Sequence, residues 1–363
     1  MNIVFCTKKT KIEDPVALQL IECVPNFSEG RDSEKIDRIA KAIQSEDVRL
    51  LHVDPGWDAN RTVMTFVGSP DAVLEAAFQG IRVASEVIDM RNQKGEHPRL
   101  GATDVCPFVP FQNTTMDECI QLSKELGKRV GRELGIPVYL YNRSAQVESR
   151  IHLSQIRKGE YEGLEKKMTH LEWQSDFGPT TFNARSGATV IGARNFLIAY
   201  NINLATQDVT IAQAIAGKIR ESGIIKRDAY GLIIKDNLGK PVREPGLFKA
   251  CKAIGWKMEC MGYTQISTNL TDMYQTLPHQ IFEACKKLAA ASGTAVTGSE
   301  LVGMIPQFAM QQAGKFYADF DDDDDFNLIL IAAKSMGLSQ ISPFIPEKRI
   351  LEWAYFENQD VII

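Results

Sequence analysis

Hydrophobic and polar residues recur with two different periods along this chain, and the change between them predicts its elements. Ile36, Ile39 and Ile43 have the spacing of one helix face, and Asp32 or Ser33 can cap that helix. Shorter apolar runs bounded by Gly, Pro, Asn and Asp predict strands. In the first half, strands are predicted at residues 21–27, 48–53, 61–68, 104–109 and 138–141, and helices at residues 33–44, 73–88, 117–134 and, as one or two helices, 151–167.

The same order of elements returns after a glycine-rich passage at residues 175–192. In the second half, strands are predicted at residues 196–203, 248–258, 263–268 and 293–301, helices at residues 209–222, 278–291, 307–317, 326–336 and 347–355, and an exposed excursion at residues 223–245. Each half begins with the order strand, helix, two strands, helix, strand, which is typical of a ferredoxin-like sandwich with helices on one face of the sheet.

We therefore predict an α/β (α+β) fold with two ferredoxin-like subdomains. The first covers residues 20–192 and the second residues 193–363, after a leader at residues 1–19. Two such halves joined by a glycine-rich passage would leave a ligand tunnel between them.

Composition and charge exclude several classes of function. The net charge of -5 gives no basic surface for nucleic acid, and the apolar runs are too short to cross a bilayer. The seven cysteines are odd in number and lack CxxC spacing, which indicates reduced thiols, no structural zinc and a cytoplasmic protein. Cys23 and Cys106 lie in apolar runs, so we expect both to be buried. The acidic tract at residues 319–325 fits a solvated loop better than a metal site.

Residues 94–110, KGEHPRLGATDVCPFVP, contain the strongest candidate for chemistry. Pro98 favours an extended backbone at His97 and excludes a helix through it. His97 therefore lies on a rigid loop between Glu96 and Arg99, immediately before an apolar strand. A loop fixed by its scaffold can present an imidazole for acid–base chemistry. The alternative is a surface histidine in a charged loop.

Two other stretches place polar groups at the ends of predicted strands. Asp54 could orient an imidazole and raise its basicity, or it could form an Asx turn with the Pro-Gly pair that follows. Asn26, Ser28 and Glu29 fit simple turn formers better than a site. The sequence contains no GxGxxG, GxxxxGK[ST], HExxH or GxSxG, so dinucleotide, P-loop, zinc protease and hydrolase functions have no supporting motif.

Two further stretches could contact a ligand. Residues 177–187 offer backbone N–H groups and hydroxyls to a flat heteroaromatic molecule, on which Phe182 could stack, while Arg185 could bind a carboxylate. Arg194 and two asparagines of the next predicted strand are polar groups beside an apolar run. Buried polar groups need partners, and a ligand can be such a partner.

Several long blocks of the sequence resemble glutamate formiminotransferase, a folate-dependent enzyme that is fused to a cyclodeaminase in animals. The match runs in order from about residue 20 and covers nearly the whole chain. The blocks are ECVPNFSEG (22–30), NRTVMTFVG (60–68), KGEHPRLGATDVCPFVP (94–110), GEYEGL (159–164), DFGP (176–179), GARNFLIAYNINL (192–204), QISTNLTD (265–272), ELVGMIP (300–306) and SPFIPEKRI (342–350).

The resemblance implies two α/β subdomains with a tunnel, and it implies roles for particular residues. His97 corresponds to the family's catalytic acid/base, and Asp54 to the Asp that follows a matching strand. The segment implied to bind folate is Gly178, Pro179, Thr180, Thr181, Phe182, Asn183, Ala184, Arg185, Ser186 and Gly187. The sequence departs from the family at residues 1–18, at Ser186, where the family has an aromatic residue, and in a longer segment at residues 224–245.

The implied reaction moves a formimino group from N-formimino-L-glutamate to N5 of tetrahydrofolate, which acts as a co-substrate. One group with a pKa near neutrality, His97, can serve both proton transfers, with Asp54 orienting it. Arg61, Arg99, Arg185 and Arg194 are the candidates for binding the glutamate carboxylates.

Two alternatives remain open at this point. The protein could be a folate-binding module without turnover, or a transferase that uses N-formylglutamate as donor. The resemblance also implies a homodimer, and it covers only the transferase part. Composition and cysteine spacing favour a cytoplasmic protein without a metal, a membrane or a nucleic acid partner.

Overall fold

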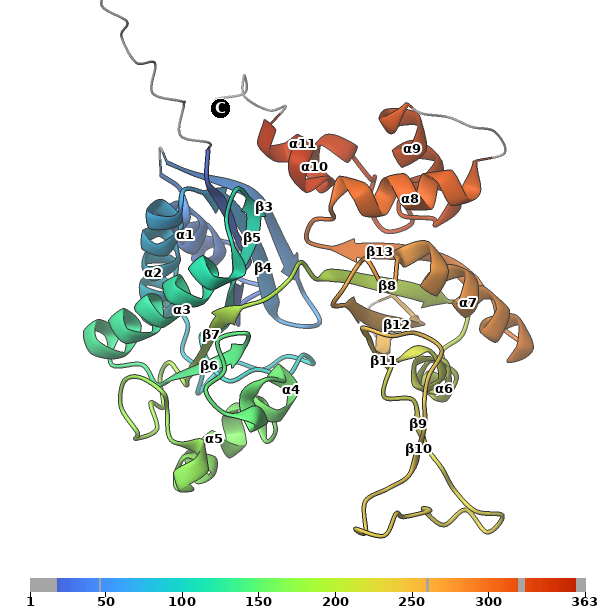
Figure 1. Ribbon diagram of the computed structural model, residues 1–363, viewed down its shortest axis with the longest axis horizontal. Helices are drawn as coiled ribbons and strands as arrows, with labels where there is room; N and C mark the ends of the chain where they lie inside the picture. Colours follow the sequence, from blue (N-terminus) through green and yellow to red (C-terminus); the bar gives the residue numbers. More distant parts are fainter. Residues whose placement is uncertain (1–17, 46, 259–260, 319–323, 357–363) are drawn as a thin grey trace, which may run out of the picture.

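The computed structural model (Figure 1) shows two α/β halves that are joined by the short segment between β7 and β8. The structure describes residues 18–45, 47–258, 261–318 and 324–356. The predicted leader at residues 1–19 therefore lies almost wholly outside the described residues, as do Cys6, Cys260 and residues 319–323 of the acidic tract.

The first half is built on one mixed sheet. Its strands are β1 (Leu20–Cys23), β2 (Asn26–Phe27), β3 (Val48–Gly56), β4 (Arg61–Gly68), β5 (Thr103–Gln112), β6 (Val138–Asn142) and β7 (Thr189–Ala193). Its helices are α1 (Ser33–Ile43), α2 (Pro70–Val87), α3 (Met116–Arg129), η1 (Val130–Leu134), η2 (Glu148–Arg150), α4 (Leu153–Ile156), α5 (Glu160–Met168) and η3 (Leu171–Trp173).

The order of the first four strand positions is that of a ferredoxin-like sandwich. β1 and β2 together occupy one place between β4 and β5, and β3 lies outside β4, all antiparallel. β7 and β6 then extend the sheet beyond β5 in parallel. The strand predicted at residues 21–27 is thus interrupted at Pro25, because proline cannot donate a ladder hydrogen bond.

The second half repeats the arrangement with a four-stranded sheet in the order β11-β12-β8-β13. Its strands are β8 (Ile198–Leu204), β11 (Cys251–Met258), β12 (Tyr263–Leu270) and β13 (Val296–Val302), with the small pair β9 (Ile224–Ile225) and β10 (Arg243–Glu244). Its helices are α6 (Val209–Ile219), α7 (Pro278–Ala291), α8 (Gln307–Tyr317), α9 (Asp325–Ser335), α10 (Pro346–Arg349) and α11 (Leu351–Phe356). The first strand again lies between the third and the fourth, so the predicted fold class is confirmed in both halves.

Three expectations about elements need correction. The passage at residues 175–192 is not only a linker, because its end forms β7, which is fully buried between β5 and β6. The helix predicted at residues 117–134 changes to a π-helical turn at η1. The last predicted helix is broken between α10 and α11, where Ile350 is extended. The excursion at residues 223–245 does form an exposed arm around β9 and β10 (Figure 1).

Each sheet has an apolar face covered by helices and a second face that carries polar groups. In the first half, α1, α2 and α3 cover a core that includes Cys23 and Cys106, whose buried sulfurs lie 3.6 Å apart as free thiols, which confirms their predicted burial. On the second face, α4 and α5 cover β6 and β7, while Leu351 and Ala354 of α11 pack on β1 and β4. Between these two apolar patches the second face is polar, and at its edge Asp54 of β3 bonds to Gly303 of the second half.

Candidate active site

The loop that carries His97 lies between α2 and β5 and is held against the turn between β3 and β4. Asn60, in that turn, donates from Nδ2 to the carbonyl of Lys94 (2.8 Å), and its Oδ1 accepts from the N–H of Gly30 (2.9 Å). One asparagine therefore joins three sequence blocks that are far apart in the chain, and it fixes the start of the His97 loop.

The ring of His97 is half-buried and its tautomer follows from one contact. Nδ1 lies 2.8 Å from the carbonyl oxygen of Pro98. A carbonyl oxygen can only accept, so the neutral ring carries its proton on Nδ1. Nε2 then has a free lone pair, and it has no hydrogen-bond partner among the described residues. This geometry leaves Nε2 available as a general base.

A buried carboxylate between two arginines lies beside His97. Asp104 is fully buried, and its Oδ2 accepts from Nη1 of Arg61 (2.5 Å) and from Nη2 of Arg157, while Oδ1 accepts from the N–H of Leu100 (2.9 Å). Burial alone raises the pKa of Asp104, but Arg157 and Arg61 outweigh it, so that pKa falls well below its usual range. Two cations facing one anion leave this end of the sheet positive.

The same surroundings keep the imidazole neutral. The pKa of His97 is lowered to about 3, chiefly by burial and then by the charges of Arg61 and Arg157, which together outweigh Asp104 and the Pro98 carbonyl. The ring is therefore a base at neutral pH. Once it has taken a proton, it becomes a strong acid that readily gives the proton up.

Asp54 lies in a different set of contacts from the one predicted. Its Oδ2 accepts from the N–H of Gly303 in the second half (2.7 Å), and the Arg349 guanidinium is close enough for Asp54 to raise its pKa. The charged groups that act most strongly on His97 are Arg61, Arg157 and Asp104. Asp104 is thus the carboxylate among the groups that act on the imidazole, and the predicted role of Asp54 stays a prediction.

Arg99 was predicted to bind a substrate carboxylate, but its donors are already used. Nε donates to Oε1 of Gln93 (2.7 Å), Nη1 to Glu160 (3.1 Å) and Glu162 (2.8 Å), and Nη2 to Glu162 (2.6 Å) and the Gln93 carbonyl (3.2 Å). A guanidinium has five N–H groups, and all five have acceptors here. The backbone adds a bond from the N–H of Tyr161 to the Arg99 carbonyl (2.9 Å), so Arg99 fastens the His97 loop to α5.

Replacing Arg99 by alanine should lower kcat while leaving KM for a substrate that carries a carboxylate within about twofold. The reason is that Arg99 holds the His97 loop against α5 and does not contact the substrate. A displacement of a catalytic group by about 1 Å can lower the rate roughly a hundredfold. Steady-state kinetics of Arg99→Ala and Glu162→Gln would measure this, with the exposed Arg132→Ala as the matched control. A large rise in KM for that substrate at unchanged kcat would restore Arg99 to a substrate-binding role.

The segment at residues 178–187 packs on the first half beside α5 and α2. Phe182 lies against Tyr161, with ring centroids 5.5 Å apart, and the Tyr161 hydroxyl donates to the Ala184 carbonyl (2.5 Å). The Arg185 guanidinium donates to two backbone carbonyls at the end of α2 (3.3 and 2.5 Å). Phe182 and Arg185 thus already have protein partners, whereas Thr180 and Thr181 are exposed.

The end of this segment joins the base of the His97 loop. The N–H of Ala102 donates to the Ser186 carbonyl (2.9 Å), and the N–H of Ala188 donates to the Leu100 carbonyl (3.2 Å). A Cβ at Gly187 would lie 2.1 Å from the Leu100 carbonyl oxygen, and Gly187 has φ +65°, so only glycine fits there. The end of this segment is therefore fixed to the chain that follows His97.

The two remaining candidate arginines are on the second face of the sheet. Arg61 is buried, and besides Asp104 it donates from Nε to Oδ1 of Asn26 (2.9 Å). Arg194 is half-buried just after β7 and donates from Nη1 to the Asn195 carbonyl (3.0 Å).

A polar network on the sheet of the second half lies opposite this face. Gln265 donates from Nε2 to Asn203 (2.9 Å) and to Glu300 (3.0 Å), and it accepts from the Trp256 indole (2.8 Å). Burial raises the pKa of Glu300, and Asp54 of the first half raises it further. Asn203, one of the two asparagines for which a ligand could be a partner, therefore has protein partners.

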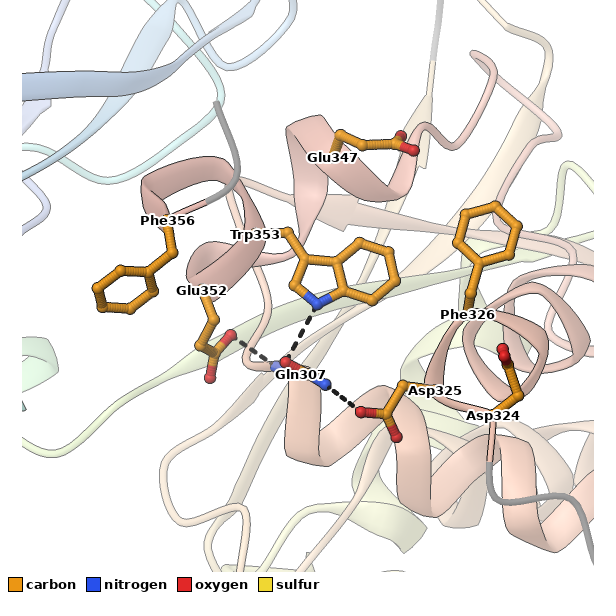
Figure 2. A pocket seen from close by; sticks show the side chains of 8 residues that line it. All are labelled: Gln307, Asp324, Asp325, Phe326, Glu347, Glu352, Trp353 and Phe356. Atoms are coloured by element: carbon orange, nitrogen blue, oxygen red, sulfur yellow. Dashed lines mark hydrogen bonds between the residues drawn. The ribbon is translucent and has the colours of Figure 1, made fainter. Parts of the chain in front are cut away.

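The cavities described lie within one half each, so the predicted tunnel between the halves stays a prediction. One of about 410 Å³ is beside the His97 loop and is lined by Lys94, Gly95, Arg99, Gly159, Glu160 and Glu162. Another, of about 450 Å³, lies between α8, α9 and α11. There Gln307 bonds to Glu352, Asp325 and Trp353 (Figure 2). No group of three or more metal-ligating side chains occurs within the described ranges.

Sequence reasoning missed Asp104 and Arg157. Asp104 did carry a signal, since it is a charged residue at the start of an otherwise apolar strand, and a buried charge needs a partner. Arg157 lies in a polar stretch with many charges, where nothing distinguishes it from its neighbours.

No helix in the part of the chain that the structure describes is long and apolar enough to span a bilayer.

Family models and individual proteins match this chain along most of its length. Residues 20–194 match the formiminotransferase domain, N-terminal subdomain, and residues 199–355 match the formiminotransferase domain. Glutamate formimidoyltransferase of Thermoplasma acidophilum is 41% identical, over 86% of this chain and 96% of that protein. The protein of the same name from Streptococcus pyogenes serotype M1 is 38% identical, over 86% of this chain and 97% of that protein.

Longer relatives match as well. Formimidoyltransferase-cyclodeaminase of Dictyostelium discoideum is 44% identical, over 94% of this chain and 62% of that protein. The chain thus spans about three-fifths of the length of that relative.

Proposed function

Since the chain belongs to the formiminotransferase family, we propose that it is an enzyme that transfers the formimino group of N-formimino-L-glutamate to N5 of tetrahydrofolate. The products would be 5-formiminotetrahydrofolate and L-glutamate, a step of histidine degradation. The observation that carries the proposal is the free Nε2 of His97, on a neutral ring whose tautomer is fixed by Pro98.

In the proposed reaction, N5 attacks the amidine carbon of the donor and a tetrahedral intermediate forms. The bond from that carbon to N5 is made, and the bond to the glutamate nitrogen breaks. Nε2 of His97 takes the proton that leaves N5 and returns it to the departing nitrogen. Because the ring binds a proton weakly, the return step is favourable.

Charge and position support a binding mode for both substrates. The excess positive charge of Arg61 and Arg157 over Asp104 favours a glutamate carboxylate near His97, and Arg194 is a second candidate. The segment at residues 178–187 is proposed to contact folate, because it adjoins the His97 loop. For Asp54 we propose an indirect role, in which its bond to Gly303 holds the second half over the site.

The decisive experiment is to mix the protein with the donor and tetrahydrofolate and to follow free glutamate. We expect glutamate release that requires both substrates. Binding of tetrahydrofolate without release would favour a folate-binding module instead. Parallel rates with N-formylglutamate decide the donor, and a faster rate with that compound would replace the formimino donor in this proposal.

The acid limb of kcat/KM should lie well below the ordinary imidazole value of about 6.5. The pKa of His97 is lowered to about 3, so the free enzyme keeps its base neutral as pH falls. Removing a neighbouring cation stabilises the imidazolium, so Arg157→Gln should move the limb upward toward 6.5. Profiles of kcat/KM from pH 5 upward should show no acid limb near 6.5 for the wild type, and a limb closer to 6.5 for Arg157→Gln. A wild-type limb near 6.5 would contradict the geometry.

We further propose a homodimer in a reducing, cytoplasmic setting. The five cysteines that the structure describes as free are all buried, which suits such a compartment. Light scattering of the purified protein tests the dimer.

A further inference from the structure

Glu22 is a buried carboxyl group for which the reaction above has no use. It lies on β1 between Ile21 and Cys23, whose side chains belong to the core under the helices. Successive side chains of a strand point to opposite faces, so Glu22 points toward the second half. The residue is only 2% exposed, and its Oε2 has no hydrogen-bond partner among the described residues. An unsatisfied buried oxygen is costly and calls for a partner.

Among the cations of this face, Arg194 is the one whose charge acts on Glu22. The Cα of Glu22 is opposite Val109 of β5, and the carbonyl of the adjacent Phe108 accepts from the N–H of Arg194 (3.1 Å). The arginine therefore follows β7 two strand positions from Glu22. Burial is the largest influence on the pKa of Glu22 and the attraction of the Arg194 guanidinium opposes it, with the result that the pKa is raised to about 8.

The other charged group at this end is Glu352 of α11, which acts to raise the pKa of Glu22. Its carboxylate already accepts from the N–H of Gln307 (2.8 Å; Figure 2). Of these two neighbouring acids, Glu352 thus has a protein partner for its Oε2, whereas the Oε2 of Glu22 has none among the described residues.

The face between Glu22 and the His97 cluster is open to solvent in its middle. Val24, Asn26 and Val63 belong to the centre of the sheet or its interruption, yet all three keep partial exposure. On the unbroken strand β4, the partners of Glu22 and Asn26 are four positions apart, so the two positions are about 13 Å apart. A bicyclic ring that is contacted by one protein side chain at each end would span this distance.

We propose that Glu22 and Arg194 bind the 2-amino-4-oxopyrimidine edge of the tetrahydrofolate ring. That edge carries two adjacent donors, the 2-amino group and N3–H, followed by an acceptor, the 4-oxo oxygen. When it is ionised, the Glu22 carboxylate accepts from both donors, and the Arg194 guanidinium donates to the oxygen. This pairing satisfies the free oxygen of Glu22 and directs N5 toward the His97 end. The inference rests on the proposed function, since it assumes that folate is the acceptor.

The test is direct binding of 5-formyltetrahydrofolate, a stable folate with a one-carbon group on N5, by calorimetry. Loss of a bidentate pair should weaken binding by about tenfold to a hundredfold, so Glu22→Gln should bind that much more weakly than the wild type. The control is Glu352→Gln, which should bind normally. In the transfer assay, Glu22→Gln should raise KM for tetrahydrofolate by a similar factor and leave KM for formiminoglutamate within twofold.

A second ligand keeps the test independent of the variant's folding. The wild type should bind the 2-desamino analogue of 5-formyltetrahydrofolate more weakly than the parent by a similar factor. Equal binding of the two ligands by the wild type, or undiminished binding of the parent ligand by Glu22→Gln, overturns the inference. If the wild type binds folate with this preference but releases no glutamate, the transfer reaction fails while the assignment of Glu22 stands.

Discussion

Replacing His97 by alanine should reduce formimino transfer at least about a hundredfold while the fold and substrate binding persist, as expected for loss of a general acid/base. The ring makes one internal hydrogen bond, from Nδ1 to the Pro98 carbonyl, and it is half-buried, so its removal leaves little unsatisfied. Nε2, in contrast, is the group available to move the proton from N5 to the glutamate nitrogen. Single-turnover glutamate release, with circular dichroism as a check on folding, measures the effect.

Two further variants make this result specific to the imidazole. His97→Gln keeps much of the volume and a donor for Pro98, but it has no titratable group, so it should be as slow as the alanine variant. The exposed His170→Ala should retain full activity. If His97→Ala transfers the group at close to the wild-type rate, the proton must move by another route and His97 loses its role.

Asp104→Asn should be the most destabilising single change near the site, by about 3–5 kcal/mol at neutral pH. The amide is neutral, so Arg61 and Arg157 would be left as two buried cations without a counter-charge. The same change removes the negative charge that acts to raise the pKa of His97, so that pKa should fall further. Urea denaturation of the purified variant gives the loss in free energy of unfolding.

The pH dependence of this loss has a defined sign. The pKa of Asp104 is lowered in the folded protein, so its contribution to stability is present above the unfolded value of about 3.9 and fades as pH falls through the folded value. The difference in free energy of unfolding between Asp104→Asn and the wild type should therefore become smaller as the pH falls.

Asp176→Asn is the matched control, because Asp176 forms a buried pair with Arg150 (2.5 Å) elsewhere in the first half. It should also lower stability, but it should leave the pH profile of transfer unchanged. If the pH profile of transfer shifts equally in Asp104→Asn and Asp176→Asn, the shift follows from the loss of stability and not from the charge of Asp104.

Local patterns in the sequence determined the framework of this protein. The helical spacing of Ile36, Ile39 and Ile43 predicts α1, and the cap at Asp32 is present, accepting from the N–H groups of Glu34 and Lys35. The repeated order of elements predicts two ferredoxin-like halves. Such features depend on neighbours in the chain, since periodicity and capping act over a few residues.

Patterns failed where burial is complete or the chain is rich in glycine. β7 is buried on both faces, so its sequence TVIGA lacks the alternation by which a half-exposed strand is predicted, and it follows a glycine-rich loop. The passage was therefore predicted to be a linker, although its end is an inner strand of the sheet.

Only the tertiary structure decided which charges act together. From sequence, Asp54 is as good a partner for His97 as any other acid. Arg99, two positions after His97, is an obvious candidate for binding a carboxylate. In the folded protein Asp54 bonds to Gly303, 249 residues away, and Arg99 gives all its donors to Gln93, Glu160 and Glu162. Asp104, Arg61 and Arg157 are instead the groups that act on the imidazole. Partner choice of this kind follows from which strands and loops pack together, because electrostatic forces depend on distance in space and on burial rather than on spacing along the chain.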